Sequence, residues 1–175
     1  DKSTETIIAQ GKALKTMVDE FSQYAKRSQQ QLVELDLNRL VREVMYLYQD
    51  YPADVVIHTN IASDQACILG DGLRLRQLLH NLVKNAIEAC IDQHGTINVD
   101  VKESSDWIIL AIKDNGIGFD QDQMVKIFEP YVTTKPKGTG LGLAIVKKII
   151  EEHHGKIAIY SEGKMQGAEI VIQFP

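Results

Sequence analysis

The sequence predicts an α+β fold: a two-layer sandwich of helices on one mixed β-sheet, preceded by a long amphipathic helix. Several segments carry apolar residues at helical spacing, and short apolar or alternating segments typical of strands lie between and after them. The composition supports a folded domain, because 44% of the 175 residues are hydrophobic and 25% are charged. Such a chain has enough apolar side chains to form a core.

The first predicted element is a helix whose apolar residues recur at alternating spacings of four and three, as in a helix that packs along a partner. Its most apolar stripe consists of Ile7, Leu14, Val18, Phe21 and Leu32. A single helix cannot bury such a stripe alone, so it packs either on the rest of its own chain or on a partner. The polar residues 26–31 that follow favour the partner.

The remaining elements follow from periodicity and breakers. Asp36 is placed to cap a helix that Pro52 ends, and residues 114–140 form a Gly- and Pro-rich loop with at most a short helix over 123–128. Loops this long inside compact domains are usually functional. We expect helices over 37–49, 71–92 and 141–153, and strands over 32–35, 55–61, 66–69, 96–102, 107–113, 156–161 and 168–174, with the segments 96–102 and 107–113 as an antiparallel pair.

Charge and composition exclude some functions. The formal net charge is −5 without a dense Lys/Arg cluster, which argues against a nucleic-acid partner. The longest apolar run, 107–112, is far shorter than the roughly 20 residues of a membrane span. Cys67 and Cys90 have apolar neighbours and no paired spacing, so we expect two buried, reduced thiols in a cytoplasmic protein. The start at Asp1 suggests a fragment of a longer protein.

Asn81 and Asn85 stand four residues apart on the predicted helix over 71–92 and therefore share a face. Amides among Leu, Val and Ala side chains are costly to bury without partners. They can bond neighbouring backbone, or their oxygens can face a ligand or a hard cation such as Mg²⁺. The two interpretations are equally open on this pattern.

The segment Asp114-Asn115-Gly116-Ile117-Gly118-Phe119 follows an apolar strand directly. A carboxylate followed by two glycines offers an acceptor and a backbone that a flat ligand can approach closely. The alternative is an ordinary turn, because Asp-Asn-Gly is common turn chemistry.

A glycine-rich turn, residues 138–143, opens the predicted helix over 141–153. Free amides and the helix dipole favour an anion at such a position. The spacing matches neither the dinucleotide fingerprint nor a P-loop. Upstream, Thr133, Thr134, Lys135 and Lys137 add hydroxyls and cations that suit phosphates, although a solvated loop is the alternative.

In this order the features resemble the nucleotide-binding segments of sensor histidine kinases, within the wider family of gyrase, Hsp90-type chaperone, histidine kinase and mismatch-repair ATPases. The matching segments are the N box at 80–89, the first glycine box at 114–119, the F box of the lid at 127–135, the second glycine box at 138–146 and the last strand at 167–175. Residues 14–27 are similar to the second helix of the dimerisation and phosphotransfer domain, in the nitrogen-regulation branch.

The resemblance implies an ATP site. Asn85 would give its amide oxygen to Mg²⁺ with Asn81 beside it near the phosphates, and Asp114 would accept the exocyclic amine of adenine, with Gly116 and Gly118 letting base and backbone meet. Lys135 could reach the β/γ end, and Phe128 and Tyr131 would anchor the lid. The other implied ATP-binding residues are Thr133, Thr134, Gly138, Thr139, Gly140, Leu141, Gly142 and Leu143.

The resemblance also implies an enzyme, a protein histidine kinase. Residues 1–31 would be the second, truncated half of a dimerisation hairpin, and residues 32–175 the catalytic ATP-binding domain. The γ-phosphoryl group would pass to a His outside this segment and on to an Asp of a response-regulator receiver domain. The protein would be a homodimer through the hairpin helices, with any membrane anchor in segments outside this sequence.

No catalytic acid or base is identified. Asn81 stands where ATP-hydrolysing relatives carry a water-activating Glu, and this difference favours a kinase over an ATPase. Residues 1–31 contain no His, so we expect the fragment to bind Mg·ATP but not to phosphorylate itself. His153 and His154 are interpreted as ordinary helix-end cations, not as a metal site. The alternatives are an anti-sigma-type serine kinase, a degenerate nucleotide-binding module, or a pure ATPase.

Overall fold

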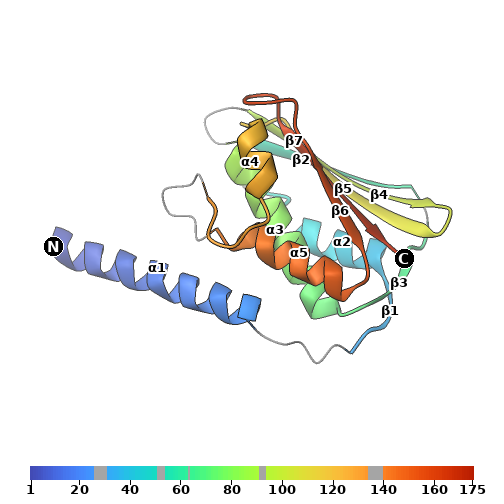
Figure 1. Cartoon of the computed structure of the whole chain (residues 1–175), viewed down its shortest axis with the longest axis horizontal. Coiled ribbons are helices and arrows are strands. Elements are labelled where there is room, and N and C mark those ends of the chain that lie inside the picture. The colour runs from blue at the N-terminus through green and yellow to red at the C-terminus, as the bar shows by residue number, and fades with distance from the viewer. Residues whose placement is uncertain (26–30, 51–53, 63, 91–93, 134–139) are drawn as a thin grey trace.

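The computed structural model describes residues 1–25, 31–50, 54–62, 64–90, 94–133 and 140–175 (Figure 1). The elements are α1 (Lys2–Ala25), β1 (Val33–Asp36), α2 (Leu37–Tyr46), β2 (Val55–Ile61), β3 (Cys67–Gly70), α3 (Gly72–Ala89), β4 (Gly95–Ser104), β5 (Trp107–Asp114), α4 (Gln121–Lys126), α5 (Gly142–Glu152), β6 (Lys156–Tyr160) and β7 (Ala168–Phe174).

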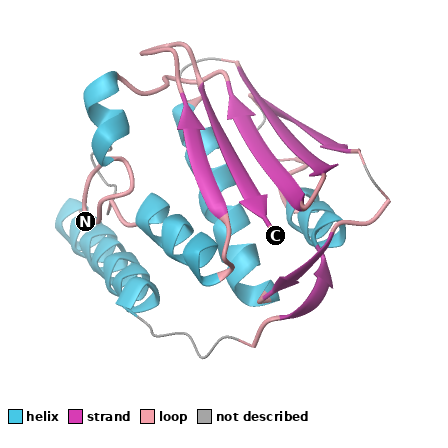
Figure 2. Cartoon of the chain, turned by 45° about the vertical axis from the view of Figure 1, so that its right-hand side comes forward, coloured by secondary structure: helices cyan, strands magenta, loops and turns pink. Residues whose placement is uncertain are grey.

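The main sheet has five strands in the order β2-β4-β5-β7-β6. β2 pairs with β4 in parallel, and the other neighbours pair antiparallel, so the predicted mixed sheet and the predicted β4–β5 pair are confirmed. Strands β1 and β3 form a separate two-stranded antiparallel sheet below the main one (Figure 2). The sequence pattern did not reveal this small sheet, because strand pairing depends on distant partners.

Helices α2, α3 and α5 cover one face of the main sheet, as both views show (Figures 1 and 2). In β7, residues alternate between buried and partly exposed, with Ala168, Ile170, Ile172 and Phe174 facing inward. This is the alternation expected of a sheet with one covered face. The predicted two-layer α+β sandwich is therefore confirmed. The central core residues from helices and strands are Val41, Val44, Leu75, Leu78, Leu79, Leu82, Ile97, Val99, Leu110, Ile145, Ile149, Ile150 and Ile172.

The start of α2 is fixed by Asp36, as predicted. Its carboxylate accepts from Asn38 N–H (3.0 Å) and from Ala66 N–H (3.1 Å), which ties the helix to the small sheet. The helix ends at Tyr46, earlier than the predicted Gln49, and residues 47–50 form a turn. Leu47 is 66% exposed, so packing does not hold a further turn. Pro52, predicted to end this helix, lies outside the described residues.

A buried polar cluster joins the start of α3 to the end of α5. Arg74 makes a forked ion pair with Glu152 (3.0 Å), and both side chains are nearly buried. His153, 2% exposed, accepts from Asp71 N–H at Nε2 (2.9 Å) and donates from Nδ1 to Ile149 O (2.7 Å). Because Nε2 needs its lone pair for this bond, the interpretation of His153 as a helix-end cation is wrong.

The two cysteines differ in burial. Cys90 is buried. Its thiol pKa is raised mainly by burial and to a smaller extent by the nearby charge of Asp114, so the thiol stays protonated. Cys67 is exposed, so its predicted burial is wrong. In β3, Ile68 and Gly70 occupy the inward positions, and alternation turns Cys67 outward.

Helix α1 extends away from the sandwich (Figure 1). Its last turn meets α5, where Lys148 Nζ donates to Tyr24 O and lies 5.5 Å from the Tyr24 ring centroid. The predicted stripe residues in α1 are otherwise uncovered within the described chain, with Ile7 68% and Leu14 61% exposed, whereas Leu32 lies beyond the end of the helix and is half-buried. None of the described helices is both long and apolar enough to span a bilayer.

Candidate functional site

One face of α3 carries the first part of the site. Asn81, Asn85 and Ala89 follow one another at four-residue spacing, which places them along one side of the helix at about 6 Å per step. Asn81 Nδ2 lies 3.5 Å from Gly142 O. A Cβ on Gly142 would lie 3.8 Å from Nδ2 of Asn85. The structure therefore brings both predicted asparagines to the start of α5.

The start of α5 differs from the starts of the other sandwich helices. Asp36, Asp71 and Asp120 cap α2, α3 and α4 with their carboxylates. Leu141 precedes α5, has no side-chain acceptor, and is buried in the core. Amide groups and the positive end of a helix dipole are thus presented beside Asn81 without a carboxylate, an arrangement that favours an anionic ligand. Any contact of Leu141 with that ligand would come from its backbone.

The two ends of the predicted lid meet beside this helix start. Tyr131 N–H donates to Gly140 O (3.0 Å). Gly140 has φ +73°, and a Cβ there would clash with the Tyr131 backbone, so glycine is required. Between these ends, Thr133 is exposed, whereas the predicted residues Thr134, Lys135, Lys137, Gly138 and Thr139 lie outside the described residues. At the lid base, Lys147 Nζ of α5 lies 5.8 Å from the Phe128 ring centroid.

Asp114 ends β5 and turns its carboxylate back onto the loop that follows. Burial raises the pKa of Asp114, and hydrogen bonds from the backbone N–H groups of Gly116 and Ala168 oppose that rise. The Gly116 bond measures 2.8 Å to Oδ1. Asp114 is therefore a partly buried acceptor that is held in place by backbone donors.

The loop after Asp114 packs against the end of α3. Ile117 N–H donates to Ala89 O (2.9 Å), and a Cβ at Gly116 would clash with the Ala89 backbone. Since Ala89 lies one turn beyond Asn85, the two predicted glycine segments lie along the same helix, one beside Asn81 and Asn85 and the other beside Ala89. This juxtaposition is the central geometry of the site.

Comparison with known proteins agrees with this geometry. Residues 70–175 match the family model described as histidine kinase-, DNA gyrase B- and HSP90-like ATPase. The chain is 35% identical to the nitrogen regulation protein NtrY of Azorhizobium caulinodans over 97% of its length, and 39% identical to the sensor histidine kinase ZraS of Escherichia coli K12 over 86%. The match covers 23% of the first relative and 33% of the second, so the chain spans about a quarter to a third of their length.

The chain belongs to the histidine kinase, DNA gyrase B and HSP90-like ATPase family. Relatives such as ZraS, together with the family model, place it among the ATP-binding catalytic domains of sensor histidine kinases. The catalytic domain of the histidine kinase ThkA superposes with a TM-score of 0.75 at 32% identity, covering 83% of this chain and 96% of that one. ThkA in complex with the response regulator TrrA gives a TM-score of 0.82 at 29% identity, covering 100% of this chain and 51% of that one.

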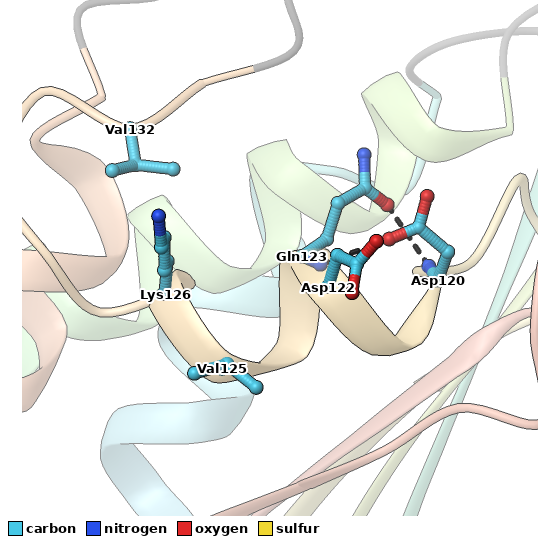
Figure 3. A pocket seen from close by; sticks show the side chains of 6 residues that line it. All are labelled: Asp120, Asp122, Gln123, Val125, Lys126 and Val132. Carbon is cyan, nitrogen blue, oxygen red and sulfur yellow. Dashed lines mark hydrogen bonds between the residues drawn. The ribbon is translucent and has the colours of Figure 1, made fainter.

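Within this kinase domain, a hollow lies beside α4, and Val132 of the predicted lid is part of its lining. It is lined by Asp120, Asp122, Gln123, Val125, Lys126 and Val132 (Figure 3). Asp120 and Gln123 bind each other in a capping box (2.9 Å in each direction). Its lining includes neither asparagine nor Asp114, and two carboxylates would repel a triphosphate. The lining of this hollow therefore differs from the residues predicted to bind ATP.

The sequence did not predict that the turn between β6 and β7 packs against the first glycine box. Gly118 has φ +63°, and a Cβ there would clash with Gly163 O, in the turn between β6 and β7. Ser161 and Gly167 of the same turn also contact this loop. The only local signal was the Gly163 and Gly167 pair before the last strand, which by itself indicates no more than a turn. Among the described residues, no group of three His, Cys, Asp or Glu side chains could hold a metal ion.

Proposed function

We propose that the intact protein transfers the γ-phosphoryl group of ATP to a His outside these residues, for relay to an Asp of a response-regulator receiver domain. The observation that carries this proposal is the alignment of Asn81, Asn85 and Ala89 on α3 with Gly142 and Gly116 beside them. Relatives named as sensor histidine kinases, and the ThkA–TrrA complex, support the phosphotransfer and the class of partner.

The adenine end of ATP is assigned to the Asp114 loop. The Asp114 carboxylate accepts the exocyclic amine, and Gly116 and Gly118 let the loop after it pack closely on Ala89 and on the turn between β6 and β7. The phosphates then extend along α3 toward Asn81, Asn85 and the amides of α5. The lid residues Tyr131, Thr133, Gly140 and Gly142 border that end, with Thr134, Lys135, Gly138 and Thr139 in the segment between.

Mg²⁺ fits the phosphate end of this site. Asn85 would hold Mg²⁺ through its amide oxygen, and phosphate oxygens and water would supply the other ligands, since Mg²⁺ keeps several waters. When bound, Mg²⁺ neutralises charge on the β- and γ-phosphates. The amides at the start of α5 orient the same phosphates. Asn81 is not a base, so the site positions the phosphoryl group without activating water.

Helix α1 is assigned to a homodimer. Its stripe of Ile7, Leu14, Val18 and Phe21 is between 48% and 68% exposed. A second copy, together with the preceding helix of a hairpin, would cover this stripe, in the way that long amphipathic helices pair. We place the domain in the cytoplasm, where response regulators and ATP are found.

The test combines labelled ATP with a separately supplied dimerisation helix that carries the acceptor His. We expect an acid-labile, base-stable phosphoadduct on that helix, and none on this chain alone. Asn85→Ala and Asp114→Ala should each weaken ATP binding at least about tenfold and abolish transfer, while leaving the fold intact by circular dichroism. An acid-stable adduct on Ser would instead indicate a serine kinase. Steady phosphate release without an adduct would indicate an ATPase.

A further inference from the structure

Ser161, in the turn between β6 and β7, ties that turn to the first glycine box. Its Oγ accepts from Phe119 N–H (3.0 Å). Its single proton has three carbonyl oxygens in range: Gly167 O at 2.7 Å, Phe119 O at 3.3 Å and Gly163 O at 3.4 Å. The shortest distance assigns the proton to Gly167 O. One hydroxyl therefore links the end of the loop to the residue that precedes β7.

The carbonyl of Gly167 and the N–H of Ala168 belong to one planar peptide group. Ala168 stands opposite Asp114 in the β5–β7 register, and its N–H acts on the Asp114 carboxyl as a backbone donor that lowers the pKa. Fixing the oxygen of a planar peptide fixes the direction of its N–H, and a donor to the oxygen also polarises the N–H. A continuous path therefore runs from the Ser161 hydroxyl through the 167–168 peptide to the carboxylate of Asp114.

The surrounding backbone leaves this path little freedom. Gly167 N–H donates to Gly116 O (3.0 Å), and Met165 N–H donates to Ile117 O (2.6 Å). A Cβ on Gly118 would lie 2.9 Å from Ser161 Oγ, and a Cβ on Gly167 would clash with Asp114 O. The turn between β6 and β7 thus contacts the loop after Asp114 mainly through backbone groups, and the Ser161 hydroxyl is the side-chain group at the centre of this contact.

We propose that Ser161 is a positioning residue for adenine recognition: it orients the 167–168 peptide and thereby holds the Asp114 carboxylate toward the exocyclic amine of the base. Ser161 does not touch the nucleotide and acts through Asp114. The proposal rests on the proposed function, because it takes Asp114 as the adenine acceptor. It assigns the turn between β6 and β7 to nucleotide selectivity as well as to the fold.

The first test compares two nucleotides in the whole chain. Ser161→Ala should weaken ATP binding about three- to tenfold, as expected for lost hydrogen bonds of this kind. Binding of purine riboside triphosphate, which lacks the exocyclic amine, should change less than about twofold, because Asp114 has no amine to accept from. Ser161→Thr, which keeps the hydroxyl, should restore ATP binding. Ser104→Ala, at an exposed strand end, is the matched control and should change neither affinity.

An equal loss for both nucleotides in Ser161→Ala would indicate a merely structural role and would overturn the proposal. An unchanged ATP affinity would overturn it too. If Ser161→Ala does not fold, Ser161→Cys decides the matter, because it keeps the shape with a much weaker donor. It should show the same selective loss for ATP.

A double-mutant cycle separates this inference from the proposed function. In an Asp114→Asn background, Ser161→Ala should add less than about twofold, because its effect passes through the carboxylate. If the effects of Ser161→Ala and Asp114→Asn on ATP affinity add fully, the proposed role of Ser161 fails but the proposed adenine site does not. If Asp114→Asn binds ATP as tightly as the unchanged chain, the assignment of the adenine site fails instead.

Discussion

Helices α3 and α5 lie side by side in opposite directions and meet through polar groups at both ends of α5, but the two junctions are built differently. At the first, Arg74 and Glu152 form a nearly buried fork, and His153 uses both ring nitrogens. At the second, Asn81 reaches Gly142 O across 3.5 Å, and α5 begins after a leucine. The first junction is closed by its own side chains, whereas at the second the start of α5 has no side-chain cap.

This difference separates stability from binding within one pair of helices. Buried charged groups that satisfy each other are costly to break, since the remaining partner is left without compensation. A helix start without a capping carboxylate loses only the stabilisation of one cap. An anion can then bind the backbone N–H groups that the cap would have occupied. Mutations at the first junction should therefore change unfolding, and mutations at the second should change nucleotide affinity.

The largest effect is expected at the closed junction. Arg74→Ala leaves the Glu152 carboxylate buried without its partner, so we expect a loss of about 3–5 kcal/mol in the free energy of unfolding. Urea denaturation followed by circular dichroism measures it. Arg39→Ala is the matched control, because the Arg39–Glu43 pair is exposed, and it should cost less than about 0.5 kcal/mol. Equal losses in the two variants would contradict the comparison.

At the open junction, Asn85→Ala should remove the advantage that Mg²⁺ gives to ATP binding. We expect affinity to fall by at least about 10–100-fold, or about 1.4–2.7 kcal/mol, in Mg²⁺. The ratio of affinities with and without Mg²⁺ should approach one, as calorimetry can measure. Lys84 is an exposed neighbour on α3, so Lys84→Ala should keep both the ATP affinity and its dependence on Mg²⁺. If Asn85→Ala retains the Mg²⁺ dependence, the metal is held elsewhere.

A smaller effect tests the cap that closes the first junction. The Asp71 carboxylate accepts from Leu73 N–H (3.0 Å) and Arg74 N–H (3.3 Å). Asp71→Ala should lower the free energy of unfolding by about 1 kcal/mol, whereas Asp71→Asn, another good capping residue, should lose only a fraction of that. ATP affinity should stay unchanged in both. A large affinity loss in Asp71→Ala would show that the two junctions are coupled.

Local pattern was enough for much of the fold. The apolar spacing of α3 and the alternation of β7 predicted those elements within a few residues, and the cap at Asp36 was predicted correctly. Periodicity reports which face is buried, so it located the strands of the sheet. It could not report that β1 pairs with β3 apart from the main sheet, because that register joins segments about thirty residues apart.

In the candidate site too, features set by local sequence were predicted, and features set by distant partners were not. Asn81, Asn85, Asp114 and the glycines were predicted as site residues because they stand in short contiguous segments, and the proximity of Asn81 and Asn85 to Gly142 was implied by the resemblance. The buried state of His153 and the contacts of Ser161 were not predictable, because their partners lie 82 and 42 residues away in sequence. A single Ser or His carries no mark of the backbone group that it will meet.

The last predicted effect uses a change of pH to test the same comparison. Burial raises the pKa of Asp114, so its carboxylate takes up a proton at a higher pH than an exposed Asp does. The carboxylate is the form that accepts the adenine amine, so ATP affinity should be full above the raised pKa and fall as the pH drops through it.

Stability should respond to Asp114 in the opposite sense. Because the folded pKa is the higher one, the ionised group costs stability above the folded pKa, and this cost disappears as the pH falls below the unfolded pKa. The measured quantity is the ratio of ATP affinities of the unchanged chain and Asp114→Asn, between about pH 7 and about pH 4.5, since the titration of the nucleotide itself cancels in that ratio. The ratio should shrink steadily toward low pH, by no more than about tenfold per pH unit. A ratio that stays constant while both proteins remain folded would mean that the Asp114 charge does not contribute to nucleotide binding, and the site would then rest on the α5 end alone.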